Sequence, residues 1–293
     1  MGTVELPLVV GVDGSDSSDL AVDWAVDEAA RHGLPLRLLY ASLAERHEED
    51  VPSAGAGRPA GKALADHVVG SAAERARRRG PTVRVLAEVV ADEPVSALVA
   101  AGRDASALIT GARGRGGLTG LLPGSVSLAV AARAPCPVVV VRGDRAGLTG
   151  AHERILLGAG EPATGERAVR FAFREAVARG CVLDVVRAWR PAPGATGSSP
   201  LAGALGRHHE ERASELLDAL LADAVAAHPD VRVHRTTVEG PARKVLVHRS
   251  AAADLVIVGA RSRTGRTGLR LGRVGHTLLH HADCPVALVP HQP

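Results

Sequence analysis

The stretch Leu108-Ile-Thr-Gly-Ala-Arg113 occurs twice in the chain in closely similar form. It returns as Val256-Ile-Val-Gly-Ala-Arg261, 148 positions later (256 − 108). A second stretch, Ala134-Pro-Cys-Pro-Val138, returns at the same offset as Ala282-Asp-Cys-Pro-Val286. Self-similarity at a fixed offset is the signature of a duplicated structural unit. The sequence therefore predicts two homologous copies of one domain.

We place these two domains at residues 1–145 and 152–293. The chain has 293 residues, which is room for two domains of ordinary size. Between them, Gly143-Asp-Arg-Ala-Gly-Leu-Thr-Gly150 has the composition of a linker. Each half also contains a stretch rich in Pro and Gly, near residues 45–61 and 190–206, which we expect to be a loop.

Within the first repeat, short aliphatic runs alternate with segments of helical periodicity. Aliphatic strands separated by helices predict a parallel sheet with helices on both faces, and right-handed crossovers make it doubly wound. The predicted fold class is α/β, with two tandem, doubly wound, five-stranded sheets of Rossmann-like type. The expected strands are residues 8–12, 36–41, 83–90, 107–110 and 137–141, and the expected helices are 17–32, 62–79, 94–102 and 125–133.

Composition argues against several classes of protein. Aromatic residues make up 2% of the chain, too few for modules that stack nucleic-acid bases on exposed rings. The net charge is +3, and the cluster Arg75–Arg79 is expected to be the solvated end of a helix, so we expect no nucleic-acid partner.

The three cysteines form no CxxC pair, and Cys136 and Cys284 are expected to be buried. No apolar run reaches the roughly 18 residues of a membrane span, and the N-terminus lacks signal-peptide features, so a cytoplasmic protein is expected.

The segment after the fourth expected strand has the pattern G-x2-G-x9-G-S, from Gly111 to Ser125. In doubly wound sheets, ligands bind beyond the carboxyl ends of the strands. Glycines let the backbone approach a polyphosphate, and the free N–H groups at a helix start attract anions. The alternative is a flexible loop followed by an ordinary serine N-cap. The candidate phosphate-binding residues are Gly111, Arg113, Gly114, Gly124, Ser125 and Val126.

The segment after the first expected strand is Val12-Asp13-Gly14-Ser15. An acidic side chain at the carboxyl end of a strand can accept hydrogen bonds from ribose hydroxyls, and we take these four residues as candidates for nucleotide binding. The alternative is a turn and a helix N-cap, which Asp and Ser form in many proteins. Motifs of P-loop enzymes, of hydrolases with a nucleophile elbow and of zinc proteases are absent from the sequence, so we expect no catalytic residue and no resident metal site.

Asp13, the loop from Gly111 to Ser125 and the closing segment Ala134-Pro-Cys-Pro-Val-Val-Val-Val-Arg142 resemble the universal stress protein family in its tandem form. The resemblance implies a sensor or regulator of stress responses that binds ATP with Mg²⁺. It also implies that Asp13 holds the ribose, the backbone near Ala41 meets the adenine, and the glycine loop holds the phosphates. Finally, it implies pairing through the fifth strands, either inside the chain as a pseudo-dimer or between chains as a homodimer.

The second half departs from this pattern. Gly160 stands where the first half has Asp13, Ser262 replaces the second loop glycine, and Gly272-Arg273 replaces the Gly-Ser pair. We therefore expect the first half to hold the nucleotide and the second to bind weakly or not at all. Two alternatives remain open at this point: a slow ATPase or phosphotransferase, and an interaction protein with a vestigial nucleotide site.

Overall fold

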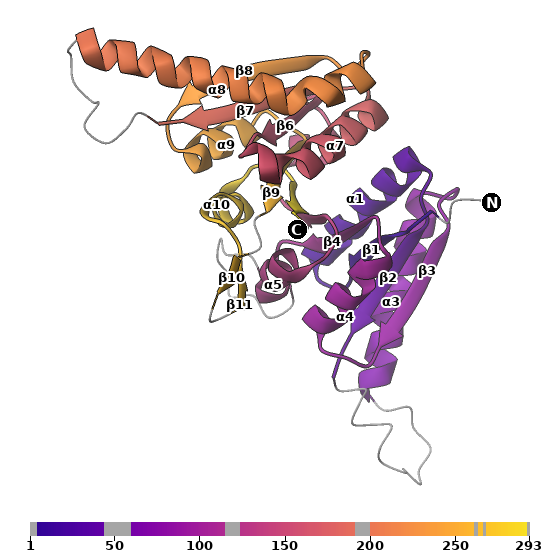
Figure 1. The fold of residues 1–293 in the computed structure, drawn as a ribbon. Coiled ribbons are helices and arrows are strands. Elements are labelled where there is room, and N and C mark those ends of the chain that lie inside the picture. Colours follow the sequence, from indigo (N-terminus) through magenta and orange to yellow (C-terminus); the bar gives the residue numbers. More distant parts are fainter. Residues whose placement is uncertain are drawn as a thin grey trace. The chain divides into compact units, whose positions relative to one another are not determined.

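The computed structural model describes residues 5–43, 60–114, 124–190, 200–260, 263–265 and 268–291. The chain divides into two compact units, Met1–Val141 and Arg142–Pro293 (Figure 1). Each unit contains five parallel strands with helices packed against the sheet, which confirms the predicted fold class. None of the described helices is long and apolar enough to cross a membrane.

The first unit follows the predicted alternation of strands and helices. Its strand order is β3-β2-β1-β4-β5, and all neighbouring pairs are parallel. The chain leaves β1 toward β2 and β3 and then returns to place β4 and β5 on the other side, so the winding reverses beside β1. The elements are β1 Leu8–Gly11, α1 Asp16–His32, β2 Leu36–Ala41, α3 Ala60–Arg79, β3 Val85–Val90, α4 Pro94–Ala101, the 3-10 turn η1 Gly102–Asp104, β4 Ala107–Gly111, α5 Ser125–Arg133 and β5 Val138–Val141.

The second unit repeats this arrangement with the order β12-β9-β6-β7-β8. It adds a short antiparallel hairpin between β9 and the last helix, where the first unit has its glycine-rich loop. The elements are α6 Arg145–Thr149, β6 Arg154–Gly158, α7 Pro162–Arg179, β7 Val182–Trp189, α8 Pro200–Ala227, β8 Val233–Glu239, α9 Ala242–Ser250, β9 Leu255–Ala260, β10 Arg263–Gly265, β11 Gly268–Arg270, α10 Arg273–His281 and β12 Val286–Pro290.

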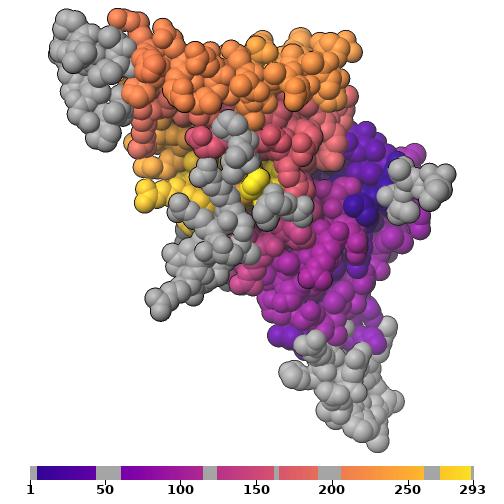
Figure 2. All heavy atoms as spheres, viewed as in Figure 1, coloured from indigo at the N-terminus to yellow at the C-terminus, as the bar shows by residue number. Residues whose placement is uncertain are grey.

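Aliphatic side chains form the core of each unit. Figure 2 shows the all-atom surface of the same face as Figure 1. In β5, all four valines are buried, as expected for a strand covered on both faces. Cys136 and Cys284 are buried, as predicted, and so is Cys181. Burial raises the pKa of the Cys284 thiol well above its ordinary value, so this cysteine stays protonated and unreactive.

Two sequence-based expectations about loops were wrong. The expected linker contains the helix α6, whose N-cap Asp144 accepts a hydrogen bond from the Gly147 N–H (2.9 Å) and donates its own N–H to the Asp283 carbonyl (3.0 Å). This segment is therefore part of the second unit. The expected loops also end earlier than predicted, because α3 starts at Ala60 and α8 starts at Pro200, where proline fits the first turn of a helix. The remaining residues of both expected loops, apart from Arg190, lie outside the described residues.

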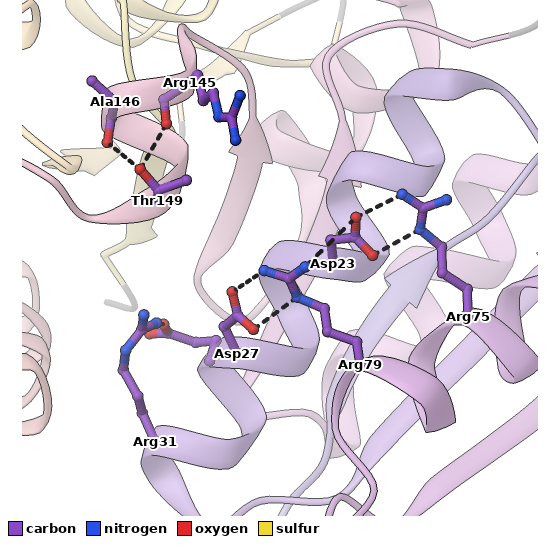
Figure 3. A network of polar contacts seen from close by, with 9 residues as sticks. Asp23, Asp27, Arg31, Arg75, Arg79, Arg145, Ala146 and Thr149 are labelled. Atoms are coloured by element: carbon purple, nitrogen blue, oxygen red, sulfur yellow. Dashed lines mark hydrogen bonds and ion pairs between the residues drawn. The ribbon is translucent and has the colours of Figure 1, made fainter.

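A ladder of ion pairs joins α1 to α3 (Figure 3). Arg75 forms two hydrogen bonds with Asp23 (2.6 and 2.7 Å) and one with Asp19 (3.0 Å), and Arg79 forms two with Asp27 (2.7 and 2.8 Å). The hydrogen bonds to Asp23 raise the pKa of Arg75 above its already high value. Part of the arginine cluster thus ties the two helices together, while Arg77 and Arg78 are exposed, as expected of a solvated helix end.

We predict that Arg75→Ala lowers the free energy of unfolding by about 1 kcal/mol, because the ladder is half-exposed and screened by water. Urea titrations of wild type and variant at low and high ionic strength measure this difference, which should shrink as salt increases. Arg78→Ala is the control, since no ion pair of Arg78 is present among the described residues. An equal loss in both variants would contradict the ladder's role.

Candidate functional site

The predicted site lies at the carboxyl edge of the first unit's sheet, where β1 stands between β2 and β4. Val12 follows β1 directly and donates its N–H to the carbonyl of Leu39 in β2 (2.9 Å). Val10 of β1 lies opposite Ile109 of β4. The loops that follow β1, β2 and β4 therefore begin on adjacent strands, at the position where open α/β sheets bind ligands.

Asp13 is held in a tight turn between β1 and α1. Its Oδ1 accepts hydrogen bonds from the N–H (3.0 Å) and the hydroxyl (2.7 Å) of Ser15, and its own N–H donates to Ser18 Oγ (3.2 Å). Ser15 is the N-cap of α1 and accepts from the Ser18 N–H (3.2 Å). Gly14 adopts φ +75°, a left-handed conformation that favours glycine. The turn and N-cap anticipated as an alternative are thus present, and they fix the position of the carboxylate.

Two loop glycines are required by close packing against the β1–α1 segment. A Cβ atom on Gly114 would lie 2.7 Å from Oδ2 of Asp13, and one on Gly111 would lie 2.5 Å from the carbonyl oxygen of Ser17. Neither position can accept a side chain unless its neighbour moves. The carboxylate of Asp13 therefore lies close beside the loop after β4, where any side chain on residue 114 would meet it.

The two ends of the loop after β4 come together in a narrow neck. The Gly124 N–H donates to the Ala112 carbonyl (2.7 Å), and the Arg113 N–H donates to Ser17 Oγ (3.1 Å). Gly124 is the N-cap of α5 and provides no side-chain cap, so the first N–H groups of this helix are not capped by a side chain of the described residues. An uncapped helix start carries partial positive charge and suits an anion.

The structure places the remaining predicted residues around this neck. Ser125 and Val126 form the first turn of α5, and the side chains of Arg113 and Ser125 are exposed. Ala41 ends β2 opposite Val90, on the same edge of the sheet but one strand further from β4 than Asp13. No hydrogen bond among the described residues joins Ala41 to the neck.

Sequence reasoning missed Ser17 and Ser18, which connect the two loops. Ser18 supports the backbone of Asp13, and Ser17 supports that of Arg113. The run of small polar residues at the start of α1 was the available signal, but it equally fits ordinary helix capping. The contact of Ser17 with Arg113 depends on how α1 packs beside β4, which sequence spacing does not specify.

The corresponding edge of the second unit has different chemistry. A cavity of about 110 Å³ lies there, and Gly160 replaces the aspartate. The Arg187 guanidinium donates through Nη1 to the Gly160 carbonyl (2.5 Å), so that a cation lies beside the position of the missing acid. No acidic residue lines the cavity among the described residues. Its lining is Gly158, Ala159, Gly160, Gly165, Val186, Ala188, Ala242, Leu246, Val258, Gly259 and Val274.

A larger hollow in the first unit, of about 630 Å³, lies at the opposite edge of the sheet, near the amino ends of the strands. It is lined by residues such as Glu5, Pro35 and Arg84 and contains none of the predicted site residues. Its size alone therefore does not make it the functional site.

Comparison with known proteins places both halves of the chain in one family. The model of the universal stress protein family matches residues 7–142 and again residues 152–290. The chain belongs to the universal stress protein family. A universal stress protein of Mycobacterium tuberculosis is 35% identical over 291 residues, which cover 95% of this chain and 95% of the relative. Its near-complete coverage agrees with a tandem universal stress protein.

Solved structures of this family share the fold. A universal stress protein from Archaeoglobus fulgidus covers 99% of this chain and 100% of its own, with a TM-score of 0.69 and 17% identity. At this identity, the likeness concerns the fold alone. A further universal stress protein, solved in complex with cAMP, is 31% identical and covers 47% of this chain and 97% of its own, with a TM-score of 0.37.

We predict that Gly111→Ala lowers the free energy of unfolding by about 1–3 kcal/mol, because its Cβ would clash with backbone atoms of Ser17. Thermal or urea unfolding of the free protein measures this loss. Gly124→Ala is the matched control, since its Cβ would make only ordinary contacts, the nearest at 3.6 Å. A Gly111→Ala variant as stable as Gly124→Ala would contradict the packing described for the neck.

Proposed function

We propose that the first unit binds an adenine nucleotide, ATP together with Mg²⁺, and that the protein acts as a sensor or regulator in stress responses. The observation that carries the proposal is the closed neck, where the uncapped start of α5 adjoins the Asp13–Gly114 contact. A carboxylate and an anion site at one strand edge suit a ligand with a hydroxylated sugar and a phosphate chain.

The proposed role of Asp13 is to accept hydrogen bonds from the ribose. An ionised carboxylate has about four lone-pair sites, so one such group can accept hydrogen bonds from neighbouring ribose hydroxyls. The turn also holds this side chain in one orientation, which lowers the ordering cost of binding. The adenine would lie toward Ala41, where neighbouring strand ends offer backbone groups.

The phosphates would lie at the start of α5. Its N–H groups and the helix dipole favour negative charge, the Ser125 hydroxyl adds a donor, and the exposed Arg113 can approach phosphate oxygens. The absence of side chains at Gly114 and Gly124 keeps the backbone accessible. Mg²⁺ is a hard cation that prefers phosphate and carboxylate oxygens, so it would arrive with the triphosphate.

The second unit would bind nucleotide weakly or not at all. Gly160 removes the ribose acceptor, and the cavity at this edge is lined mainly by glycine and aliphatic residues. Arg273 stands at the start of α10, where the first unit has Ser125, and its side chain is exposed. The charge of this arginine still favours an anion, but the groups that would orient a nucleoside are missing.

We further propose that the nucleotide is held without rapid turnover. Oδ1 of Asp13 is committed to Ser15, and Oδ2 lies against the Gly114 backbone, which suits positioning better than proton abstraction. Nucleotide occupancy would then act by changing the surface around the neck that a partner protein meets. The predicted pairing through the fifth strands and the cytoplasmic location stay predictions.

The decisive experiment counts nucleotide in protein purified without added ligand. We expect one adenine nucleotide to be released per denatured chain, identified as ATP by mass spectrometry. Asp13→Ala should lose it because the ribose acceptor is removed. Gly124→Ala should also lose it, because the new methyl group would point toward the Gly114 N–H, inside the neck.

Gly272→Ala is the matched control in the second unit. Gly272 is the N-cap of α10, as Gly124 is of α5, and a Cβ added there meets no atom of the described residues within 4 Å. The amount of nucleotide should therefore be unchanged. Two equivalent nucleotides per chain would contradict the asymmetry, and protein that neither retains nor takes up nucleotide on titration would contradict the proposal as a whole.

A further inference from the structure

The outermost strand of the sheet differs in side-chain chemistry between the two units. β3 and β8 are the outermost strands of their sheets, and each pairs on one side only among the described strands (Figure 1). They are equivalent in the repeat, because Val85 lies opposite Leu36 in the first unit and Val233 lies opposite Leu183 in the second. The repeat thus provides an internal comparison of one edge in two versions.

The outer edge of β3 presents unpaired backbone groups on apolar residues. The carbonyl of Arg84 accepts a hydrogen bond from the Leu36 N–H of β2, and that of Val90 accepts one from the N–H of Ser42, directly after β2. The polar groups of Arg84 and Val90 therefore point inward. Since the direction alternates along a strand, the N–H and C=O groups of Val85, Ala87 and Val89 point outward. An unpaired row of this kind is a template for another strand.

The middle of β3 is apolar where the middle of β8 is polar. Leu86 is 46% exposed and Ala87 is also exposed, while the equivalent residues of β8 are the exposed pair His234 and Arg235. Arg235 lies 3.3 Å from Asp218 of α8. The charges of the first edge lie on either side of this middle, at Arg84 and Glu88. Charged side chains on an edge strand oppose pairing with other chains unless opposite charges meet. The edge of the second unit is therefore better protected in its middle than that of the first.

We propose that β3 pairs with β3 of a second copy of this chain, antiparallel about a two-fold axis at Leu86. A two-fold axis requires an antiparallel, self-complementary contact. In this register, Val85 lies opposite Ala87 of the second copy, and their outward groups can exchange hydrogen bonds. Arg84 lies opposite Glu88, so each copy brings an opposite charge to the other.

Charge complementarity selects this register and this occupant. Glu88 is already held by Arg37 of β2 (2.6 Å), and its side chain remains 42% exposed, so it can face a second cation. Opposite charges placed directly across an antiparallel pair stabilise it, whereas like charges destabilise it. The pairing involves neither the neck nor the fifth strands and is independent of nucleotide binding.

The register makes a sharp geometric prediction for Leu86. Its backbone groups point toward β2, so Leu86 and its symmetry mate would form a non-hydrogen-bonded pair with Cα atoms about 4.5 Å apart. This separation falls within the range that a disulfide spans. The three native cysteines are buried, so the background of cross-linking is low.

The test is mild oxidation of the full-length Leu86→Cys variant, with His234→Cys at the equivalent position of β8 as the control. We expect a disulfide-linked dimer from Leu86→Cys and monomer from His234→Cys on non-reducing gels. Equal cross-linking of the two variants, or none in either, would overturn the proposal.

Analytical ultracentrifugation provides an independent measurement without cysteines. The apparent molecular mass of the wild-type protein should approach twice the chain mass of 30.1 kDa as the protein concentration rises. Arg84→Glu would place like charges opposite each other twice across the axis and should weaken dimerisation by roughly tenfold. Circular dichroism verifies folding. Wild type that stays monomeric, or Arg84→Glu that dimerises like wild type, would overturn the proposal, even if nucleotide binding is intact.

Discussion

The contact between the Asp13 carboxylate and the backbone of Gly114 is the constraint on which the candidate site depends. A Cβ atom on residue 114 would lie 2.7 Å from Oδ2, so a glycine lets the loop after β4 approach without displacing the carboxylate. Ser17 and the Ala112–Gly124 hydrogen bond then close the loop at its base. These contacts bring one acid, two glycines and an uncapped helix start together at the carboxyl ends of β1 and β4.

The tandem repeat separates what the fold needs from what the site needs. The second unit keeps the same strand order and buried aliphatic strands although it has Gly160 in place of the aspartate. Its core therefore does not depend on an aspartate at this position. The second unit thus retains the scaffold without Asp13, while the first also has the residues that we propose to recognise a ligand.

Sequence patterns predicted the fold closely where local signals agree with packing. The bounds of β2 and α5 match the prediction to the residue, because glycine, proline and aliphatic periodicity all act locally there. The patterns failed where composition misled. Gly and Pro suggested a linker and a loop, yet Asp144 caps a helix and Pro200 starts one. At the candidate site, spacing predicted Asp13 and Gly114, which lie close together in the structure. The hydrogen bond from Arg113 to Ser17, in contrast, arises only when α1 packs beside β4.

We propose that the first unit holds the nucleotide through its neck and that the second does not. Hydrogen–deuterium exchange with and without ATP and Mg²⁺ is the sharpest test, because it reports on both units of one chain in a single measurement. We predict that ATP slows exchange at the start of α5 and in the turn after β1, with no change at the start of α10 or after β6. Equal protection in both units, or none in either, would contradict the account.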